Sequence, residues 1–423
     1  MLTLAYLRQH KDEAIQRLQV KHFSQIELID KVLELDEKRR QIQKQSDDIK
    51  AQQNQLSKQI GQFFAQGKKQ EAEQKKAESA SLKSQAENLI RELHSIEQAI
   101  EEILVLIPNT PHSSVPQGKS AENNVLVKEG GQKPNLFPNP LPHWELAKKL
   151  DIIDFELGAK VTGTGFPVYK GKGAKLERAL INFFLDNAVA AGYKEVTPPI
   201  LVNKESAFGT GQLPDKDGQM YYIAQDELYL IPTAEVPITN LYRDMIIEEK
   251  DLPIKNCGYT PCFRREAGSY GAHVRGLNRL HQFDKIEIVQ ITKPEDSYRA
   301  LQEMCDYVES LLIKLELPYR IILLCGGDMS FASAKTYDFE VYSAAQDKWL
   351  EVSSVSNFET FQSNRLKLRY RTAEKKNELA HTLNGSALGM ARVVAALIEN
   401  NQTEDAHVKI PACLQPYTGF DLI

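Results

Sequence analysis

Residues 82–107, LKSQAENLIRELHSIEQAIEEILVLI, carry apolar side chains at alternating steps of four and three residues. The positions that follow this spacing are Leu82, Ala86, Leu89, Leu93, Ile96, Ile100, Ile103 and Ile107. Because side chains with this spacing lie along one side of an α-helix, the pattern is the heptad signature of a coiled-coil seam. The segment therefore predicts a long helix that packs against a second one.

The second helix is expected on the N-terminal side of this segment. Apolar residues recur there every seven positions, and the complementary positions three residues later are polar. The apolar set is Leu28, Leu35, Ile42, Ile49, Leu56 and Phe63, and the polar set is Lys31, Lys38, Gln45, Gln52 and Gln59. With a break near Gly67, these patterns predict an antiparallel arm over about residues 27–105 of a helical domain 1–107. At ~1.5 Å per residue the arm would be about 55 Å long.

The distal half of the predicted arm is basic. Between Lys38 and Lys76 there are ten basic residues and only four acidic ones. A coiled coil that only joins two copies of a chain usually carries charges of both signs along its length, and that role remains the alternative. A basic tip favours a polyanionic partner, because Lys and Arg clusters neutralise phosphates. The net charge of the whole chain, −5, does not indicate DNA binding.

The composition is that of a globular protein, with 42% hydrophobic and 26% charged residues. No uncharged apolar run reaches the ~18 residues of a membrane helix. The first thirty residues lack the apolar core of a secretory signal, and the five cysteines form no CxxC pair. These features predict a cytoplasmic protein with no membrane partner and no zinc site. Neither GxGxxG nor GxxxxGK[ST] occurs, which excludes two common nucleotide-binding loops.

Seven prolines between Pro108 and Pro142 follow the helical domain. We expect residues 108–142 to form an extended proline-rich linker and residues 143–423 a second domain. There, 176–193 is expected as a helix, 195–202 as a proline-containing edge strand, and 258–266 and 280–290 as strands around a loop with Gly268, Gly271 and Gly276. Strands joined by loops, without regular crossover helices, predict an α+β domain with an antiparallel sheet flanked by helices.

Two short motifs carry the candidate chemistry. FRRE (263–266) ends a predicted strand, where Arg264 and Glu266 would share a face and could hold a phosphate or carboxylate and an amine. Such a pair, taken alone, is more often a surface ion pair. GSALGMAR (385–392) leads from small residues into a helix with Arg392 in its first turn. Because the helix dipole disfavours a cation there, the arginine suggests a bound anion.

These motifs, with LERALINFFLDNAVAAGYKEVTPP (176–199) before them, resemble the three signature motifs of class II aminoacyl-tRNA synthetases. Further segments are similar to the bacterial type of the seryl-tRNA synthetase family: TGQLP (210–214), TAE (233–235), RGLNRLHQFDKIEI (275–288) and EVSSVSNFETFQSNR (351–365). With the predicted arm, the resemblance covers essentially the whole chain. It implies a homodimeric, ATP-dependent ligase that converts L-serine to seryl-adenylate. The seryl group would then pass to the 3′ end of tRNA(Ser), and of tRNA(Sec) where that tRNA is present.

The resemblance also implies a role for each matching residue. The residues implied for serine are Thr233, Ala234, Glu235, Arg264, Glu287 and Ser386. Those implied for ATP are Arg264, Arg265, Glu266, Arg279, Phe283, Glu351, Val352, Ser353, Ser354 and Arg392. Glu351 and Ser354 would coordinate Mg²⁺, and Arg264, Glu351 and Arg392 would be the catalytic residues.

The chain departs from the family pattern at four positions, which are Gly165, Ala387, Gly389 and Ala391. Ala387 and Ala391 each add a methyl group where the family usually has glycine, and we expect these methyl groups near the ligand. Two other functions remain open. A non-catalytic relative with an RNA-binding or regulatory role would normally have lost the motif arginines or the metal-binding acid. A class II ligase that acts on a carrier protein would lack the basic arm.

Overall fold

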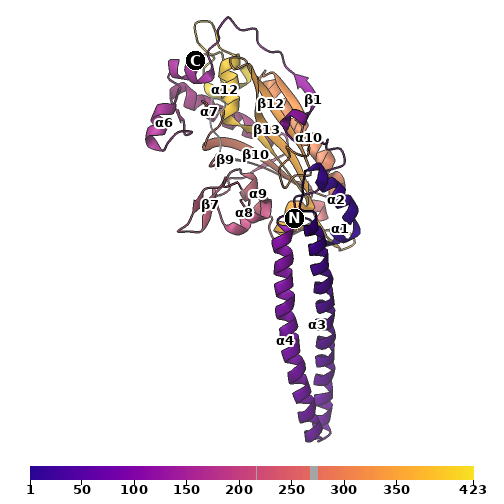
Figure 1. Cartoon of the computed structure of the whole chain (residues 1–423). Helices are drawn as coiled ribbons and strands as arrows, with labels where there is room; N and C mark the ends of the chain where they lie inside the picture. The colour runs from indigo at the N-terminus through magenta and orange to yellow at the C-terminus, as the bar shows by residue number, and fades with distance from the viewer. Residues whose placement is uncertain (216, 267–274) are drawn as a thin grey trace. The chain divides into compact units, whose positions relative to one another are not determined.

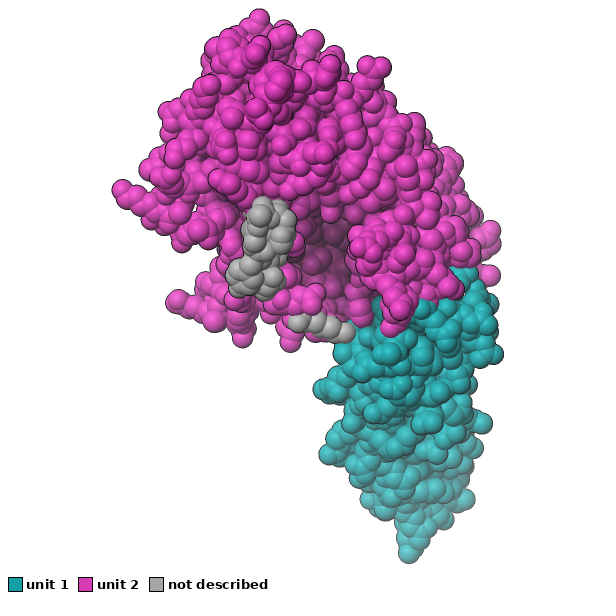
Figure 2. All heavy atoms as spheres, turned by 45° about the horizontal axis from the view of Figure 1, so that its top comes forward, with its two compact units in different colours: residues 1–19, 23–108 teal, residues 20–22, 109–423 magenta. Residues whose placement is uncertain are grey.

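The computed structural model describes residues 1–215, 217–266 and 275–423 (Figure 1). Contacts within the chain divide it into two compact units (Figure 2). Unit 1 contains residues 1–19 and 23–108, and unit 2 contains residues 20–22 and 109–423. Gly268 and Gly271, predicted in a loop, lie outside the described residues. None of the helices in the described ranges is long and apolar enough to cross a membrane.

Unit 1 consists of two short helices and an antiparallel pair of long ones. The short helices are α1 (Leu4–Gln9) and α2 (Lys11–Val20, whose last residue is assigned to unit 2), and the long ones are α3 (Glu27–Ala65) and α4 (Lys69–Leu104). Figure 1 shows α3 and α4 side by side. The turn between them places Gly67 at φ +73°, a left-handed conformation that glycine adopts without steric cost. The predicted pair of long helices is confirmed.

The α3 side of the seam differs in phase from the prediction. Gln45 is exposed, and the complementary position is the next residue, Ser46, which is 1% exposed. Asp36 is also fully buried and accepts hydrogen bonds from Arg8 of α1 at 2.9 Å and from Arg39 at 3.0 Å. The complementary positions were assigned one residue too early because polar side chains occupy part of the buried stripe.

Unit 2 is built on an eight-stranded sheet in the order β1-β11-β12-β13-β16-β10-β9-β4. Neighbouring strands are antiparallel except for β4 and β9, which are parallel. The strands are β1 (Val125–Gly130), β4 (Lys194–Glu195), β9 (Ile254–Phe263), β10 (Gln282–Thr292), β11 (Tyr319–Leu323), β12 (Lys335–Ser343), β13 (Lys348–Glu359) and β16 (His381–Gly389). The predicted antiparallel sheet is therefore confirmed.

Smaller sheets and helices surround this sheet. The sheets pair β2 (Ile153–Asp154) with β3 (Val168–Tyr169), join β5 (Leu201–Val202), β7 (Leu228–Leu230) and β6 (Tyr222–Ile223), and join β15 (Asn377–Leu379), β14 (Arg369–Arg371) and β8 (Ile246–Glu248). The helices are α5 (His143–Lys149), α6 (Phe155–Val161), α7 (Gly171–Ala190), α8 (Lys204–Thr210), α9 (Glu235–Asn240), α10 (Ser297–Lys314), α11 (Thr360–Leu366), α12 (Met390–Asn400) and α13 (Gln415–Thr418).

The prediction of one edge strand over residues 195–202 is wrong. Only Lys194 and Glu195 pair with β9, whereas Leu201 and Val202 pair with β7 in another sheet. Prolines 198 and 199 lie between the two pairs, and a proline has no amide hydrogen to donate to a neighbouring strand. Residues 109–142, expected as a linker, pack within unit 2 and supply the edge strand β1.

The core of unit 2 lies between one face of the large sheet and three helices. Ile286 and Ile288 of β10 join a buried cluster with Phe184 of α7, Leu312 of α10 and Val393 of α12. Side chains alternate between the two faces along a strand, so the odd-numbered residues of β10 face away from these helices. That second face of the sheet carries the cavity described next.

Candidate active site

A cavity of about 390 Å³ is lined by residues of β10, β12, β13, β16 and α12 and of neighbouring segments, including the one that follows β9. Figure 2 shows that the surface of unit 2 is hollowed. The cavity brings together twelve residues predicted from the sequence: Thr233, Arg264, Glu266, Arg279, Phe283, Glu287, Glu351, Val352, Ser353, Ser354, Ser386 and Arg392. Three predicted residues, Ala234, Glu235 and Arg265, are not part of its described lining.

Thr233, Lys285 and Glu287 form a buried polar triad in the cavity wall. Lys285 Nζ is 2.6 Å from Glu287 Oε2 and donates to Thr233 Oγ1 at 2.8 Å. The Thr233 hydroxyl in turn donates to Glu287 Oε2 at 2.9 Å. Ser386 of β16 lies opposite Glu287 in the strand register. Because positions 283, 285 and 287 share one face of β10, the strand presents Phe283, the lysine and the glutamate to the same cavity.

Glu235 is buried next to this triad. Its Oε1 accepts a hydrogen bond from Gln362 Nε2 at 2.6 Å, and it is 6% exposed. Burial, and then the carboxylate of Glu287, raise the pKa of Glu235 to about 7. Ala234 packs in a small apolar cluster with Ile238, so it supports α9 and contributes no side chain to the cavity lining.

The FRRE motif lies where β9 ends. β9 stops at Phe263, and Glu266 has φ +48°, so the alternation expected for Arg264 and Glu266 on one strand is wrong. Both side chains nevertheless line the cavity. The Arg264 guanidinium lies 5.2 Å from the centroid of the Phe283 ring, and Glu266 forms an ion pair with Arg279. The backbone N–H of Arg265 donates a hydrogen bond to the carbonyl of Gln219 at 2.9 Å.

Arg392 is the third residue of α12, as predicted, and its guanidinium is held by two backbone carbonyls. Its Nε donates to Asn278 O at 2.9 Å and its Nη1 to Glu351 O at 2.8 Å. The carboxylate of Glu351 is further away, with its Oε2 3.7 Å from Arg392 Nη1. The dipole of α12 directs partial positive charge toward the same end of the helix. This end of the cavity is therefore suited to an anion.

A β-bulge arranges the acidic side of the cavity. The register between β12 and β13 shifts so that Asp338 pairs with Ser354 but Glu340 pairs with Glu351, which leaves Val352 as the extra residue. Without the bulge, residues 351 and 354 would face opposite sides of the sheet; with it, both line the cavity. Loss of solvent, and then the Glu351 carboxylate, raise the pKa of Asp338 well above its ordinary value.

Several polar residues of the lining were missed from the sequence, among them Lys285, Asp338 and Asn384. Lys285 could have been found, because it lies two residues before Glu287 on the same strand face. The expected effect of Ala387 is wrong, since this alanine is 0% exposed and belongs to the core cluster. Ala391 does line the cavity, as expected.

Comparison with known proteins identifies the family. The seryl-tRNA synthetase N-terminal domain family matches residues 1–111, and the tRNA synthetase class II core domain (G, H, P, S and T) matches residues 221–401. The serine–tRNA ligase of Salinibacter ruber is 57% identical over 321 residues, which are 76% of this chain and 75% of that protein.

Two solved structures extend the similarity to nearly the whole chain. The seryl-tRNA synthetase from Pyrococcus horikoshii complexed with ATP has a TM-score of 0.92 and 31% identity, covering 100% of this chain and 99% of that one. The cytoplasmic serine–tRNA ligase from Naegleria fowleri in complex with AMP has a TM-score of 0.85 and 30% identity, covering 97% and 95%. The chain belongs to the seryl-tRNA synthetase family, which confirms the resemblance seen in its sequence.

Proposed function

We propose that this chain activates L-serine with ATP in the cavity of unit 2 and transfers the seryl group to the 3′ end of tRNA(Ser). The observation that carries the proposal is a single cavity in which a buried polar triad lies beside three arginines. The triad suits a small polar amino acid, and the arginines suit phosphates. We extend the proposal to tRNA(Sec) where that tRNA is present.

Serine would occupy the part of the cavity next to the triad. Its ammonium group would pair with Glu287, which lines the cavity, and would lie near Glu235, a carboxyl group buried beside the triad. Its hydroxyl would hydrogen-bond with Thr233 and Ser386. A site whose buried groups hydrogen-bond a substrate hydroxyl rejects the analogue without it by ~10⁴- to 10⁵-fold, because those groups would be left unpaired. Alanine should therefore be rejected strongly.

ATP would lie between Phe283 and the arginines. Phe283 offers its ring to the adenine, and Glu266 offers a carboxylate to the adenine amino group. Arg264 would bind the α-phosphate and the serine carboxylate together, which brings the two reacting groups to one guanidinium. Arg392, at the N-terminal end of α12, would bind the terminal phosphate.

Residues at the β-bulge fit Mg²⁺. Glu351 and Ser354 supply hard oxygen donors on one face, and the buried Asp338 Oδ1 has no hydrogen-bond partner within the described ranges. No group of three or more His, Cys, Asp or Glu side chains there is arranged to hold a metal. Mg²⁺ is usually bound by one or two carboxylates together with substrate phosphates. When bound, it would neutralise charge on the phosphate oxygens.

The chemistry needs positioning and charge neutralisation and no protein nucleophile. A serine carboxylate oxygen forms a bond to the α-phosphorus while the bond to the bridging oxygen breaks, and the electron pair leaves with pyrophosphate. Arg264 stabilises the charge at the α-phosphate, and Arg392 the charge that develops on the leaving group. In the second step a hydroxyl of the terminal tRNA ribose attacks the seryl carbonyl, and AMP leaves.

We assign tRNA binding to unit 1 because of its basic tip. Lys68 and Lys69 lie at the turn between α3 and α4, where φ of Gly67 is positive. Their ammonium groups would contact the phosphate backbone of the long variable arm of tRNA(Ser), a contact that depends on shape more than on base sequence. The five free cysteines support a cytoplasmic location.

A homodimer is part of the same proposal. β1 is an edge strand with three consecutive exposed apolar residues, Val125, Leu126 and Val127, which are 45%, 52% and 53% exposed. At the opposite edge, β4 pairs over only two residues. Such edges are usually covered by another chain or element. Sedimentation at micromolar concentration should give twice the chain mass of 47.8 kDa, and a monomer would contradict this part of the proposal.

ATP–pyrophosphate exchange, measured with each of the twenty amino acids, tests the function. We expect exchange that depends on serine and Mg²⁺, with alanine and threonine far weaker. Exchange with serine but no charging of tRNA(Ser) would contradict the transfer step. Binding of tRNA without any exchange would favour a non-catalytic RNA-binding relative over the ligase.

A further inference from the structure

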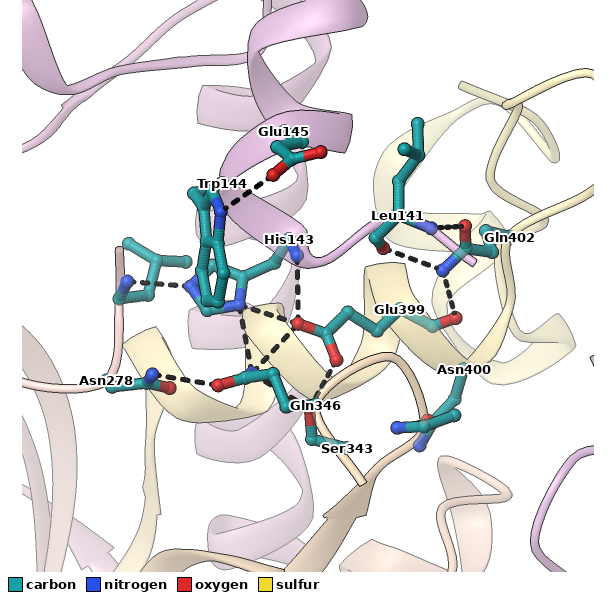
Figure 3. Close-up of polar contacts among 12 residues, drawn as sticks. Leu141, His143, Trp144, Glu145, Asn278, Ser343, Gln346, Glu399, Asn400 and Gln402 are labelled. Atoms are coloured by element: carbon teal, nitrogen blue, oxygen red, sulfur yellow. Dashed lines mark hydrogen bonds and ion pairs between the residues drawn. The ribbon is translucent and has the colours of Figure 1, made fainter. Parts of the chain in front are cut away.

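A buried histidine at the start of α5 joins two segments that are distant in sequence. His143 is 0% exposed, and its Nε2 lies 2.8 Å from the backbone nitrogen of Leu277 (Figure 3). Its Nδ1 lies 2.7 Å from Oε1 of Glu399 in α12. An amide N–H can only donate, so Nε2 accepts and Nδ1 carries the proton that is donated to Glu399. The imidazole therefore ties the segment before β10 to α12.

The carboxylate of Glu399 is the fixed point of this arrangement. Its Oε1 also accepts from the backbone N–H of His143 at 2.8 Å and from Gln346 Nε2 at 2.9 Å, and its Oε2 accepts from the Ser343 hydroxyl. Burial alone would raise the pKa of Glu399, but the hydrogen bonds from His143 and Ser343 outweigh burial and lower the pKa. An ionised acceptor on one side keeps the imidazole proton on Nδ1 and leaves Nε2 free to accept.

The segment that His143 contacts has little room to move. Gly276 has φ +69°, and a Cβ added there would lie 2.2 Å from Nε2 of His143. The guanidinium of Arg275 stacks over the ring of Trp144, with its carbon 4.8 Å from the ring centroid. The first turn of α5 therefore holds residues 275–277 by three separate contacts.

The backbone held in this way supports Arg392. The carbonyl of Asn278 accepts the Nε–H of Arg392 at 2.9 Å, one of the two backbone contacts that orient its guanidinium. The side chain of Asn278 donates to Gln346 at 2.9 Å, and Gln346 donates to Glu399. Two routes thus connect Glu399 with the peptide that faces Arg392, one through His143 and one through Gln346 (Figure 3).

We propose that His143 is a positioning residue for the ATP site. By accepting the Leu277 N–H, it holds the Asn278 carbonyl where it orients the Arg392 guanidinium toward the cavity. The inference rests on the proposed function in one respect, the role of Arg392 as a phosphate ligand. His143 itself is buried and outside the cavity lining, so it touches neither ATP nor serine.

Two amide substitutions distinguish the roles of the two ring nitrogens of His143. The amide of His143→Asn reaches the position of Nδ1, so it keeps a donor for Glu399 but loses the acceptor for Leu277. The amide of His143→Gln reaches the position of Nε2, so it can restore that acceptor. We expect His143→Asn to raise KM for ATP about 10- to 100-fold, the cost of a misplaced catalytic group, with KM for serine unchanged. His143→Gln should recover most of this loss.

A general loss of stability would give a different result, because a smaller folded fraction lowers kcat and leaves both KM values unchanged. Ser343→Ala is the matched control. It removes a buried donor to Glu399 and the acceptor of one Gln346 hydrogen bond, but it removes no direct contact with residues 275–278 and leaves both bonds of the imidazole, so it should lower Tm without changing KM for ATP. Equal KM values for ATP in His143→Asn and the wild type would overturn the inference, as would a Gln variant no better than the Asn variant.

A double-mutant cycle tests the route through Arg392. If His143 acts through this arginine, His143→Asn should weaken ATP binding no further in an Arg392→Ala background, whereas additive losses would overturn the proposal. Titration calorimetry with ATP gives this result without any turnover. If the wild type binds ATP but shows no serine-dependent exchange, the proposed function is contradicted. The calorimetric test of His143 would still hold in that case, because it measures only ATP binding.

Discussion

Lys285 and Glu287 form an ion pair of 2.6 Å on the cavity face of β10, where they are 6% and 2% exposed. Both side chains also hydrogen-bond with Thr233. A buried pair adds little net stability relative to an apolar pair, but the loss of one partner leaves an uncompensated charge. We infer that Lys285 holds the Glu287 carboxyl group in place at the cavity wall, where it can meet the serine ammonium.

Lys285→Met should destabilise unit 2 by about 3–5 kcal/mol and raise KM for serine, because the Glu287 carboxylate would lose its cation. Urea unfolding and serine-dependent exchange measure the two effects. Adding Glu287→Gln removes the unpaired charge and should recover part of the stability but not the serine affinity. If Lys285→Met alone keeps the stability and the KM for serine of the wild type, the ion pair has no role in the pocket.

The resemblance to the family implied Phe283 and Glu287, which lie four residues apart on one face of β10. The alternation of side chains along a strand would have added Lys285, which lies between them on the same face. The acidic side could not be predicted in this way, because the bulge at Val352 reverses the alternation between residues 351 and 354. Only the resemblance to the family joined Glu351 with Ser354.

Backbone conformation and buried polar groups limited the other predictions. Glu266 reaches the cavity from a left-handed conformation after β9 has ended, which no alternation rule describes. Ser46 lies in the seam of α3 because α4 packs against it, although hydrophobicity alone assigns this position to the surface. Ala387 lies in the core because β16 is covered on that face, so its methyl group displaces no ligand. In each case tertiary packing outweighed the local pattern.

Arg392→Ala should slow adenylate formation roughly 100- to 1000-fold, the usual cost of removing one preorganised stabiliser of transition-state charge. The fold should survive, because the guanidinium contacts two backbone carbonyls at the cavity and no core side chain. Pre-steady-state measurement of pyrophosphate release gives the rate. Arg299→Ala, on an exposed part of α10, is the matched control and should leave the rate unchanged. Normal pyrophosphate release by Arg392→Ala would contradict the assignment.

Glu235 should make stability depend on pH. Burial, and then Glu287, raise its pKa from 4.5 to about 7, so the folded protein binds this proton more tightly than the unfolded chain. The free energy of unfolding should therefore fall as pH rises from about 4.5 to about 7, by roughly 1.4 kcal/mol per pH unit from this group. Comparing urea midpoints of the wild type and Glu235→Gln between pH 5 and 8 isolates the effect. Parallel pH curves would contradict it.

The same titration should affect serine binding in the opposite direction. The ionised form of Glu235, buried beside the proposed serine pocket, would attract the serine ammonium, so KM for serine should fall as pH rises through about 7. In Glu235→Gln this change should disappear, while KM for serine becomes high at every pH. An unchanged pH dependence in the variant would assign the titration to another group.

The arm should be needed for aminoacylation and not for adenylate formation. The cavity residues all belong to unit 2, so ATP and serine require no residue of the arm. Lys38 of α3 forms an ion pair with Glu92 of α4 at 3.1 Å, so these two residues lie at the same level of the arm. Deleting residues 38–76 would therefore shorten α3 to this level but leave residues 77–91 of α4 without a partner helix. A trim that preserves this register replaces residues 43–87 by residues 66–68 of the natural turn. We expect normal pyrophosphate exchange and a large loss of tRNA charging.

Charge reversal tests the same contact without shortening the arm. Lys68→Glu with Lys69→Glu should raise KM for tRNA(Ser). The dependence of this KM on salt concentration should become weaker, because binding with fewer phosphate contacts releases fewer counterions. Lys149→Glu with Lys160→Glu, at exposed positions of unit 2, makes the same change in net charge and should have little effect. A coiled coil that only joined two copies would respond differently, since the trimmed protein would sediment as a monomer. If the trimmed protein charges tRNA(Ser) at the normal rate, the basic tip does not bind tRNA.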